Sequence, residues 1–349
     1  MKEMVKRRTM SFPRKVVIGH GVLEDLPSVV LELTGAEKVL VVTGPRTYEA
    51  AGGRVRELLS SEGVEVEIVF PDAPTIGEAE RVSRMEGDVI LGVGGGSKID
   101  VAKLAAKLSN RPFISVPTSA SHDGVASPMA SLRGAGKKHS VPAAPPLAIV
   151  ADTSVIVRAP YRYMASGAAD LISNLTALMD WELSHRLTGE EISHSAYALS
   201  NMAANLVVEH ASDIKPNLEE SAWLVMKSLI MSGVSMSVAG SSRPASGAEH
   251  MFAHALEELA PGRGLHGELC GLGTIIMAYL HGADWEGIRD ALATIGAPTR
   301  ASQLGIPDEK VVEALLLAPR IRPERFTILG VGGLKKEAAV AAARKTGVI

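Results

Sequence analysis

The sequence has little cysteine and little net charge. Cys270 is the only cysteine among 349 residues, which excludes an intrachain disulfide and a cysteine-based zinc knuckle and indicates a reducing compartment, the cytoplasm. The formal net charge of -3 argues against nucleic acid as a partner. No apolar core follows the basic N-terminus, and no apolar run approaches the roughly 20 residues of a membrane span. We therefore expect neither a signal peptide nor insertion into a membrane.

The length of the chain predicts about two domains, because a 36.7 kDa chain is long for a single core. The first part alternates short apolar runs with amphipathic stretches, and its runs KVLVV and DVILGV are nearly continuous, as in parallel strands buried on both faces. Beyond residue 158 helical periodicity replaces the strand patterns. We predict an α/β dinucleotide-binding domain over residues 1–158 and an all-α domain over residues 159–349, with metal and substrate bound by the second domain.

A glycine-rich segment lies between a predicted strand and a predicted helix. It places Gly92 and then Gly94 to Gly96 before a helix that begins at Ser97. Glycines let backbone N–H groups approach a pyrophosphate closely, and a helix N-terminus adds partial positive charge. The segment departs from a strict GxGxxG and follows a later strand than the first, so a simple tight turn is the alternative. We favour binding of dinucleotide phosphates.

Small hydroxyl side chains follow the next predicted strand, PFISV, where α/β sheets bind ligands. These residues are Thr118, Ser119, Ser121 and Ser127. His122 and Asp123 are the polar residues of this segment that could reach a substrate. A hydrogen-bonded turn before Gly124 is the alternative for both.

Three histidines, His250, His254 and His266, lie close together in the second part. Residues four apart share a helix face, so the first two point into one volume, and the helix breakers over residues 261–264 return the third toward it. Such imidazoles suit zinc or ferrous iron, and a catalytic metal needs about three protein ligands and an open position. Asp170 is the candidate acid, although it could instead complement a helix dipole. Each histidine taken alone would more often be an ordinary surface or core residue.

The combination of these motifs resembles a known superfamily. The motifs are GGGSKID, PTSASHDGVASP, GAADLISN, SGAEHMFAHAL and LHGELCGLGT. Over nearly its whole length the chain resembles the superfamily of glycerol dehydrogenases, iron-containing alcohol dehydrogenases and dehydroquinate synthases. Within it, RPERFTIL at residues 322–329 and two of these motifs are similar to the archaeal sn-glycerol-1-phosphate dehydrogenases. The resemblance implies a Rossmann-like α/β domain with an all-α domain, the dehydroquinate synthase-like fold.

The same resemblance implies an activity and its residues. The reaction is reversible NAD(P)H-dependent reduction of dihydroxyacetone phosphate to sn-glycerol 1-phosphate for archaeal membrane phospholipids, with a metal polarising the ketone and hydride passing to C2. One zinc ion per subunit would bind Asp170, His250 and His266. Asp123, Asp170 and His254 would contact substrate as catalytic residues, with Asp123 and His254 as hypothetical members of a proton relay. The implied cofactor-binding residues are Gly94, Gly95, Gly96, Ser97, Lys98, Ile99, Asp100, Thr118, Ser119, Ala120, Ser121 and Ser127.

A phosphorylated substrate needs cationic partners. Arg243, which precedes the predicted metal-binding helix, is the substrate-binding candidate, and Lys137, Lys138 and Arg325 are weaker ones. Solvated surface charges are the alternative for all four.

The end of the strand KVLVV bears on cofactor choice. Relatives that prefer NAD carry an acid there, whereas this chain has Thr43 and Gly44, with Arg46 nearby. No carboxylate at this position would repel a 2′-phosphate, so we predict use of both NADH and NADPH.

Other functions fit the same sequence. They are a glycerol dehydrogenase for the unphosphorylated alcohol, an iron-dependent alcohol dehydrogenase, a dehydroquinate synthase, a nickel-dependent glycerol-1-phosphate enzyme and, from another class, a non-catalytic nucleotide-binding regulatory protein. Alanine-rich amphipathic helices of the second part suggest a homo-oligomer.

Overall fold

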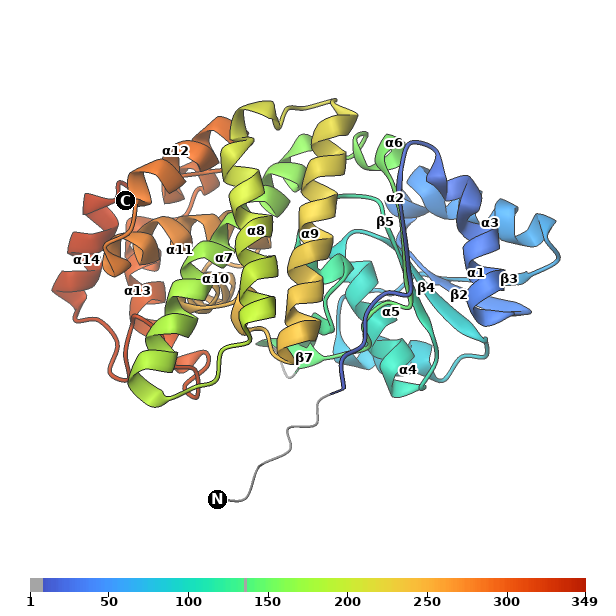
Figure 1. Ribbon diagram of the computed structural model, residues 1–349, viewed down its shortest axis with the longest axis horizontal. Helices are drawn as coiled ribbons and strands as arrows, with labels where there is room; N and C mark the ends of the chain where they lie inside the picture. The colour runs from blue at the N-terminus through green and yellow to red at the C-terminus, as the bar shows by residue number, and fades with distance from the viewer. Residues whose placement is uncertain (1–8, 135–136) are drawn as a thin grey trace, which may run out of the picture.

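The first part of the chain folds around a parallel sheet, as its alternating pattern predicts. The computed structural model in Figure 1 describes residues 9–134 and 137–349. Its six-stranded sheet has the order β1-β8-β5-β4-β2-β3, with every neighbouring pair parallel. The strands are β1 (Lys15–Gly19), β2 (Lys38–Val42), β3 (Glu65–Val69), β4 (Val89–Gly94), β5 (Phe113–Pro117) and β8 (Ala148–Asp152). Every residue of β4, β5 and β8 is buried, which is why these runs are mostly apolar.

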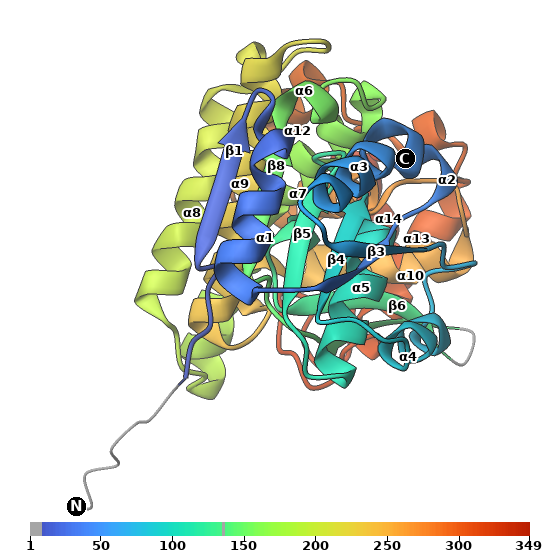
Figure 2. The ribbon, with the colours of Figure 1, turned by 90° about the vertical axis from the view of Figure 1, so that its right-hand side faces the viewer.

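Helices cover both faces of this sheet. The helical elements are η1 (Val22–Asp25), α1 (Leu26–Thr34), α2 (Pro45–Thr47), η2 (Tyr48–Gly52), α3 (Gly53–Ser61), α4 (Ile76–Ser83) and α5 (Gly96–Leu108). Figure 2 shows α1 and α3 in front of the sheet. Successive side chains of a strand point to opposite faces, so Val39 and Val41 of β2 join the core under α1 and α3, whereas Leu40 and Val42 join the core under α4 and α5.

The direction of chain progression reverses between β2 and β4. From β2 the chain moves outward to the edge strand β3, and then it returns to the other side of β2 to form β4 and β5. In open α/β sheets ligands bind outside the carboxyl ends of the strands at such a switch point. Gly44 follows β2 there, and Gly95 follows β4.

The part of the chain that the structure describes beyond Asp152 contains helices and no strand, as predicted. The longer helices are α7 (Tyr161–Thr188), α8 (His194–Glu209), α9 (Glu219–Ala239), α10 (Ala248–Leu259), α11 (His266–His281), α12 (Trp285–Ile295), α13 (Asp308–Leu317) and α14 (Lys336–Lys345). The short ones are α6 (Thr153–Ile156), η4 (Ala211–Asp213), η5 (Arg243–Ala245), η6 (Ala301–Leu304) and η7 (Ala318–Arg320). Helix α11 packs along α7 near the centre of this part.

The sequence did not predict a β-hairpin that follows β5 in the chain. Beyond η3 (Asp123–Val125), strand β6 (Met129–Gly134) pairs antiparallel with β7 (Lys137–Pro142). The alternation that signals β6 is short, with Ala130 and Leu132 buried between more exposed neighbours. The side chains of Lys137 and Lys138, two candidate phosphate ligands, lie outside the described residues.

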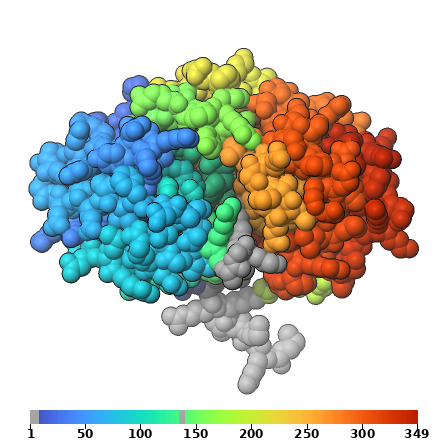
Figure 3. All heavy atoms as spheres, turned by 180° about the vertical axis from the view of Figure 1, so that it is seen from behind, coloured from blue at the N-terminus to red at the C-terminus, as the bar shows by residue number. Residues whose placement is uncertain are grey.

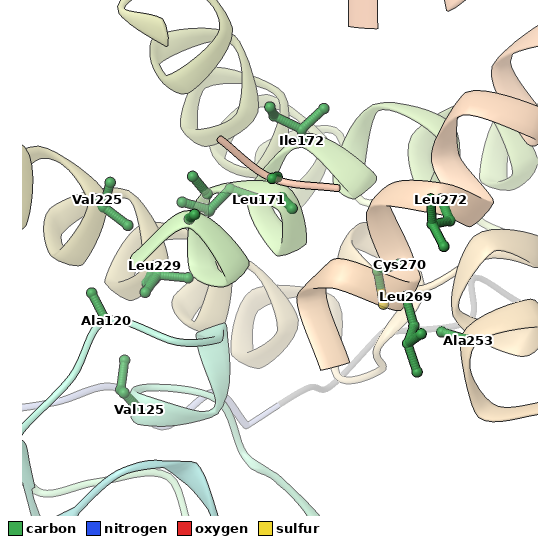
Figure 4. Packing of buried hydrophobic residues seen from close by; sticks show 14 of the residues in the cluster. Ala120, Val125, Leu171, Ile172, Val225, Leu229, Ala253, Leu269, Cys270 and Leu272 are labelled. Carbon is green, nitrogen blue, oxygen red and sulfur yellow. The ribbon is translucent and has the colours of Figure 1, made fainter. Parts of the chain in front are cut away.

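A shared core joins the two parts of the molecule. Figure 4 shows Ala120 and Val125, from the segment after β5, beside Leu171 of α7 and Leu229 of α9, and all four belong to one buried cluster. Among the described helices, α9 alone is long and apolar enough to cross a membrane by length and composition, contrary to the expectation that no run approaches that length. Most of its apolar stretch is buried inside the protein, as in the core helix of a globular fold.

Candidate active site

The first cavity lies at the switch point of the sheet. It has a volume of about 710 Å³. Its walls include Gly44 to Thr47 after β2 and Gly95 to Lys98 at the start of α5. The first turn of a helix leaves backbone N–H groups without partners inside the helix, so the start of α5 offers donors and partial positive charge to an anion. The arrangement suits a dinucleotide pyrophosphate.

Gly96 is needed because a histidine ring lies against it. A Cβ atom at this position would stand 1.5 Å from Nε2 of His122, so any larger residue would require the His122 ring to move. On its other side, the His122 ring is in contact with Gly124, whose backbone N–H donates to Nδ1 over 2.9 Å. The glycines of both predicted binding segments therefore bring the α5 turn and the His122 loop together.

The structure places the predicted cofactor residues in different surroundings. Gly95, Gly96, Ser97, Lys98, Thr118, Ser119 and Ser121 line this first cavity. The side chains of Ile99 and Ala120 lie in the hydrophobic core. Asp100 and Ser127 line a second cavity instead, and the Asp100 carboxylate pairs with the buried Lys103 at 3.2 Å. A motif gives the order of residues, but helix periodicity turns some of them away from the ligand.

The second cavity, also about 710 Å³, lies between the α/β part and the helical part. Figure 3 shows these parts as two lobes that face each other across a furrow. Residues of η3 and β6 line one side of the cavity, and residues of α10 and the turn before α11 line the other. Four residues line both cavities, so a cofactor in the first would meet a substrate in the second beside them: Ser97, His122, Leu265 and His266.

A group of metal-ligating side chains lies where the cavities meet. Asp170 of α7, His250 of α10, and His266 and Cys270 of α11 each present a ligand atom within 4.8 Å of the others. Oδ1 of Asp170 is 3.7 Å from Nε2 of His250 and 3.9 Å from Nε2 of His266. One carboxylate oxygen and two imidazole nitrogens match the donor set of an open catalytic zinc or ferrous site.

Two glutamates hold the histidines of this group. Glu249 contacts Nδ1 of His250 at 3.0 Å, and Glu257 contacts Nδ1 of His266 at 3.1 Å. A carboxylate on one ring nitrogen fixes the tautomer that leaves the other nitrogen for a metal, so these contacts fit a metal site. Burial would raise the pKa of Glu249, but the hydrogen bond and charge of His250 lower it overall. In turn Glu249 and then Asp170 raise the pKa of His250 against the effect of burial.

A close approach of two helices positions the ligands. The backbone carbonyl of Ser166 in α7 lies so near Gly267 that a Cβ there would be 1.9 Å from the oxygen. This contact places His266, the residue before Gly267, beside Asp170, which follows Ser166 by one helical turn. A larger residue at position 267 would force α11 away from α7.

Asp123 is joined directly to the metal-ligating group. Its backbone N–H donates to Oδ2 of Asp170 over 3.1 Å, and its own Oδ2 accepts from the Ser232 hydroxyl at 2.9 Å. Burial raises the pKa of Asp123, and the charge of His122 and the hydrogen bond from Ser232 offset this only in part. Asp123 lines the second cavity.

His254 faces the same cavity from α10. Its Nδ1 contacts Oε2 of Glu257 at 3.0 Å, and its ring stacks 5.3 Å from that of His266, between ring centroids. His254 is not in the four-residue group around Asp170, but with Glu257 and His266 it forms a neighbouring group of possible ligands. Glu257 thus links the two histidines.

Arg243 does not lie where the sequence suggests. Its side chain is buried, with Nε donating to Glu190 at 2.8 Å and Nη1 donating to the Phe326 carbonyl at 2.9 Å. Among the described residues that line the second cavity, the arginines are Arg133 and Arg322. Arg243 precedes the predicted metal-binding helix α10 in the sequence, but η5 turns its side chain toward α7. Its position in the sequence therefore did not predict the position of its side chain.

Sequence reasoning missed several residues of the site. Glu249, Glu257 and Cys270 had detectable signals, since each stands next to, or about one helical turn from, a predicted histidine ligand. Arg322 begins the motif RPERFTIL of the resemblance, but nothing local linked it to the site, because it reaches the cavity from a segment 56 residues after His266.

Comparison with known proteins agrees with this arrangement. The family described as iron-containing alcohol dehydrogenase matches residues 17–160. A protein of Methanoculleus marisnigri named glycerol-1-phosphate dehydrogenase [NAD(P)+] is 55% identical over 337 residues, which cover 96% of this chain and 93% of that protein. One of the same name from Methanothermobacter thermautotrophicus is 53% identical over 98% of this chain and 99% of its own. The chain belongs to the glycerol-1-phosphate dehydrogenase family.

Solved structures agree with this family assignment at the level of the fold. A glycerol dehydrogenase from Schizosaccharomyces pombe superposes with a TM-score of 0.82 at 23% identity, covering 98% of this chain and 90% of that one. An iron-containing alcohol dehydrogenase from Thermotoga maritima gives a TM-score of 0.71 at 18% identity, covering 97% and 99%. The predicted fold class, an α/β domain followed by a helical one, is confirmed for this family member.

Proposed function

We propose that this protein is an NAD(P)-dependent glycerol-1-phosphate dehydrogenase that interconverts dihydroxyacetone phosphate and sn-glycerol 1-phosphate for archaeal membrane phospholipids. Identities above 50% over nearly the whole chain to enzymes of that name support the activity. The observation that carries the proposal is that the cavity at the start of α5 and the cavity between the two parts meet at one metal-ligating group. A glycerol dehydrogenase or a regulatory protein has no comparable support from these relatives.

In this proposal the two parts of the chain bind different ligands. Residues 1–158 bind the dinucleotide, with its pyrophosphate at the start of α5. Residues 159–349 bind metal and substrate through α7, α10 and α11. The furrow between them lets the nicotinamide approach the substrate near His122 and His266.

A metal ion would be held by Asp170, His250 and His266. We assign zinc, one ion per subunit, although these oxygen and nitrogen donors also suit ferrous iron. When bound, the ion would act as a Lewis acid on the substrate carbonyl while the nicotinamide supplies hydride to C2. Cys270 contacts Nε2 of His266 at 3.6 Å, and we assign it no place among the ligands, so that an open position is kept.

The remaining polar side chains orient the substrate and move its proton. The Asp123 carboxyl accepts from Ser232 through one oxygen, and it lines the cavity where a substrate hydroxyl would lie. Because burial raises its pKa, this carboxyl is suited to exchange a proton with a bound alcohol. His254, held by Glu257, lies on the opposite wall and completes the contacts to the substrate.

The first cavity suits both nicotinamide cofactors. None of its described lining residues is an aspartate or a glutamate, whereas Arg46, Lys98 and Arg158 are cations among them. No carboxylate therefore repels the 2′-phosphate of NADPH, and Arg46, which is exposed near Gly44, can attract it.

This proposal predicts oxidation of NADH and of NADPH with dihydroxyacetone phosphate. We expect the two values of kcat/KM to lie within about 100-fold of each other, because a single exposed cation contributes little. The measurement is the initial rate of absorbance loss at saturating dihydroxyacetone phosphate with zinc present. No oxidation of either cofactor would contradict the function, and a preference for NADH above about 1000-fold would contradict the cofactor assignment.

The enzyme is placed in the cytoplasm in this account, where Cys270 would stay reduced. Assembly into a homo-oligomer through its alanine-rich helices remains a prediction.

A further inference from the structure

Arg322 of the substrate cavity and its neighbour Arg325 form no salt bridge with a carboxylate of the described residues. Arg322, which lines the cavity, and Arg325 follow η7 in the segment after α13. Both are mostly buried, which makes an uncompensated charge costly.

The hydrogen-bond partners of both arginines are neutral. Nη1 of Arg322 donates to the hydroxyls of Ser242 at 3.1 Å and Ser246 at 3.4 Å. Nη2 of Arg325 donates to the same Ser242 hydroxyl at 3.0 Å, and its Nη1 donates to the backbone carbonyl of Ser246. These contacts fix the direction of both guanidinium groups but leave their positive charge without a counterion.

Glu324 and Glu249 act on Arg322 through their charge, but neither forms a salt bridge with it among the described residues. Glu190 binds Arg243, and Glu249 binds His250. Burial and the charges of Arg322 and Arg243 lower the pKa of Arg325 to about 9. Since a guanidinium stays protonated in proteins, an anion bound beside it would offset this unfavourable charge.

We propose that Arg322, supported by Arg325, binds the phosphate of the substrate and makes the enzyme selective for phosphorylated ketones. Arg322 shares one cavity with Asp123, His250 and His266, so the arginine and the metal-ligating group face the same space. Planar arginine donors match phosphate oxygens in pairs. This inference rests on the proposed function, and it transfers the role expected of Arg243 to the arginine that lines the cavity.

The test compares substrates with and without the phosphate. In Arg322→Gln, kcat/KM for dihydroxyacetone phosphate relative to that for dihydroxyacetone should fall about 10- to 100-fold, the effect of losing a charged hydrogen bond. Arg322→Lys keeps the charge but not the paired donors, so its ratio should lie between those of the wild-type protein and Arg322→Gln. Arg320→Gln, an exposed neighbour in η7, is the matched control and should leave the ratio unchanged. An equal loss on both substrates would show a merely structural role and overturn the proposal.

A binding measurement separates this proposal from the proposed function. Calorimetric titration of the zinc-loaded protein with inorganic phosphate should show binding that Arg322→Gln weakens at least about tenfold. This result would stand even if the wild-type protein reduced neither ketone, in which case only the proposed function fails. Unaltered phosphate binding in Arg322→Gln would refute the assignment, as would a selective effect of Arg133→Gln, at the exposed rim of the cavity, without one of Arg322→Gln.

Discussion

Replacing His266 with alanine should remove the metal and nearly all activity. The variant loses one of three proposed ligands and the contact between the histidine and Glu257. We expect bound zinc to fall below about one tenth per subunit, and kcat for dihydroxyacetone phosphate to fall about 1000-fold or more, because Lewis-acid activation is worth several kcal/mol. Metal analysis of the purified protein and steady-state rates measure the two effects.

Two further variants test whether this loss is specific to the metal ligand. Glu257→Gln keeps all three ligands but weakens the support of His266, so metal affinity should fall about 10- to 100-fold. His194→Ala changes an exposed histidine at the start of α8 and should alter neither property. Zinc retained at one ion per subunit in His266→Ala would contradict the ligand assignment.

Asp123→Asn should abolish most turnover while leaving the metal in place. The substitution preserves shape and the backbone contact to Asp170, but it removes a carboxyl group that can donate a proton during reduction and accept one during oxidation. We expect kcat to fall about 100- to 10,000-fold, the range for loss of a general acid–base group. Rates and metal content measured on the same preparation separate this effect from metal loss.

Ser232→Ala is the matched control for Asp123. It removes the hydroxyl that donates to the Asp123 carboxylate and accepts from Asn174, but it leaves the carboxyl group itself. The expected loss in kcat is about tenfold or less, because only one of these hydrogen bonds reaches Asp123. If Asp123→Asn lost no more activity than Ser232→Ala, Asp123 would be a positioning residue without a part in proton transfer.

Much of the fold could be predicted because its signals are local. The apolar runs of β4 and β5 are buried along their whole length, and α5 begins at Gly96, one residue before its predicted start at Ser97. The β6–β7 hairpin was missed because only Ala130 and Leu132 mark an alternation. The length of α9 was also missed, since serines and a lysine interrupt its apolar pattern.

Part of the candidate site could be predicted from helix periodicity and from glycines that allow two segments to approach closely. His250 and His254 share a helix face, and the α5 turn needs Gly96 to accommodate His122. Contacts between segments far apart in the chain gave no local signal. The pairing of Arg243 with Glu190 and the approach of Arg322 to the cavity depend on how α7, η5 and the segment after η7 pack in three dimensions.

The most direct test of the account is to identify the product formed from dihydroxyacetone phosphate. Zinc-loaded protein is incubated with dihydroxyacetone phosphate, or with dihydroxyacetone, together with NADH or NADPH, and the stereochemistry of the product is typed enzymatically. We predict reduction of the phosphate ester to sn-glycerol 1-phosphate with either cofactor, and little reduction of dihydroxyacetone. Formation of sn-glycerol 3-phosphate, or reduction of dihydroxyacetone alone, would contradict the proposed function.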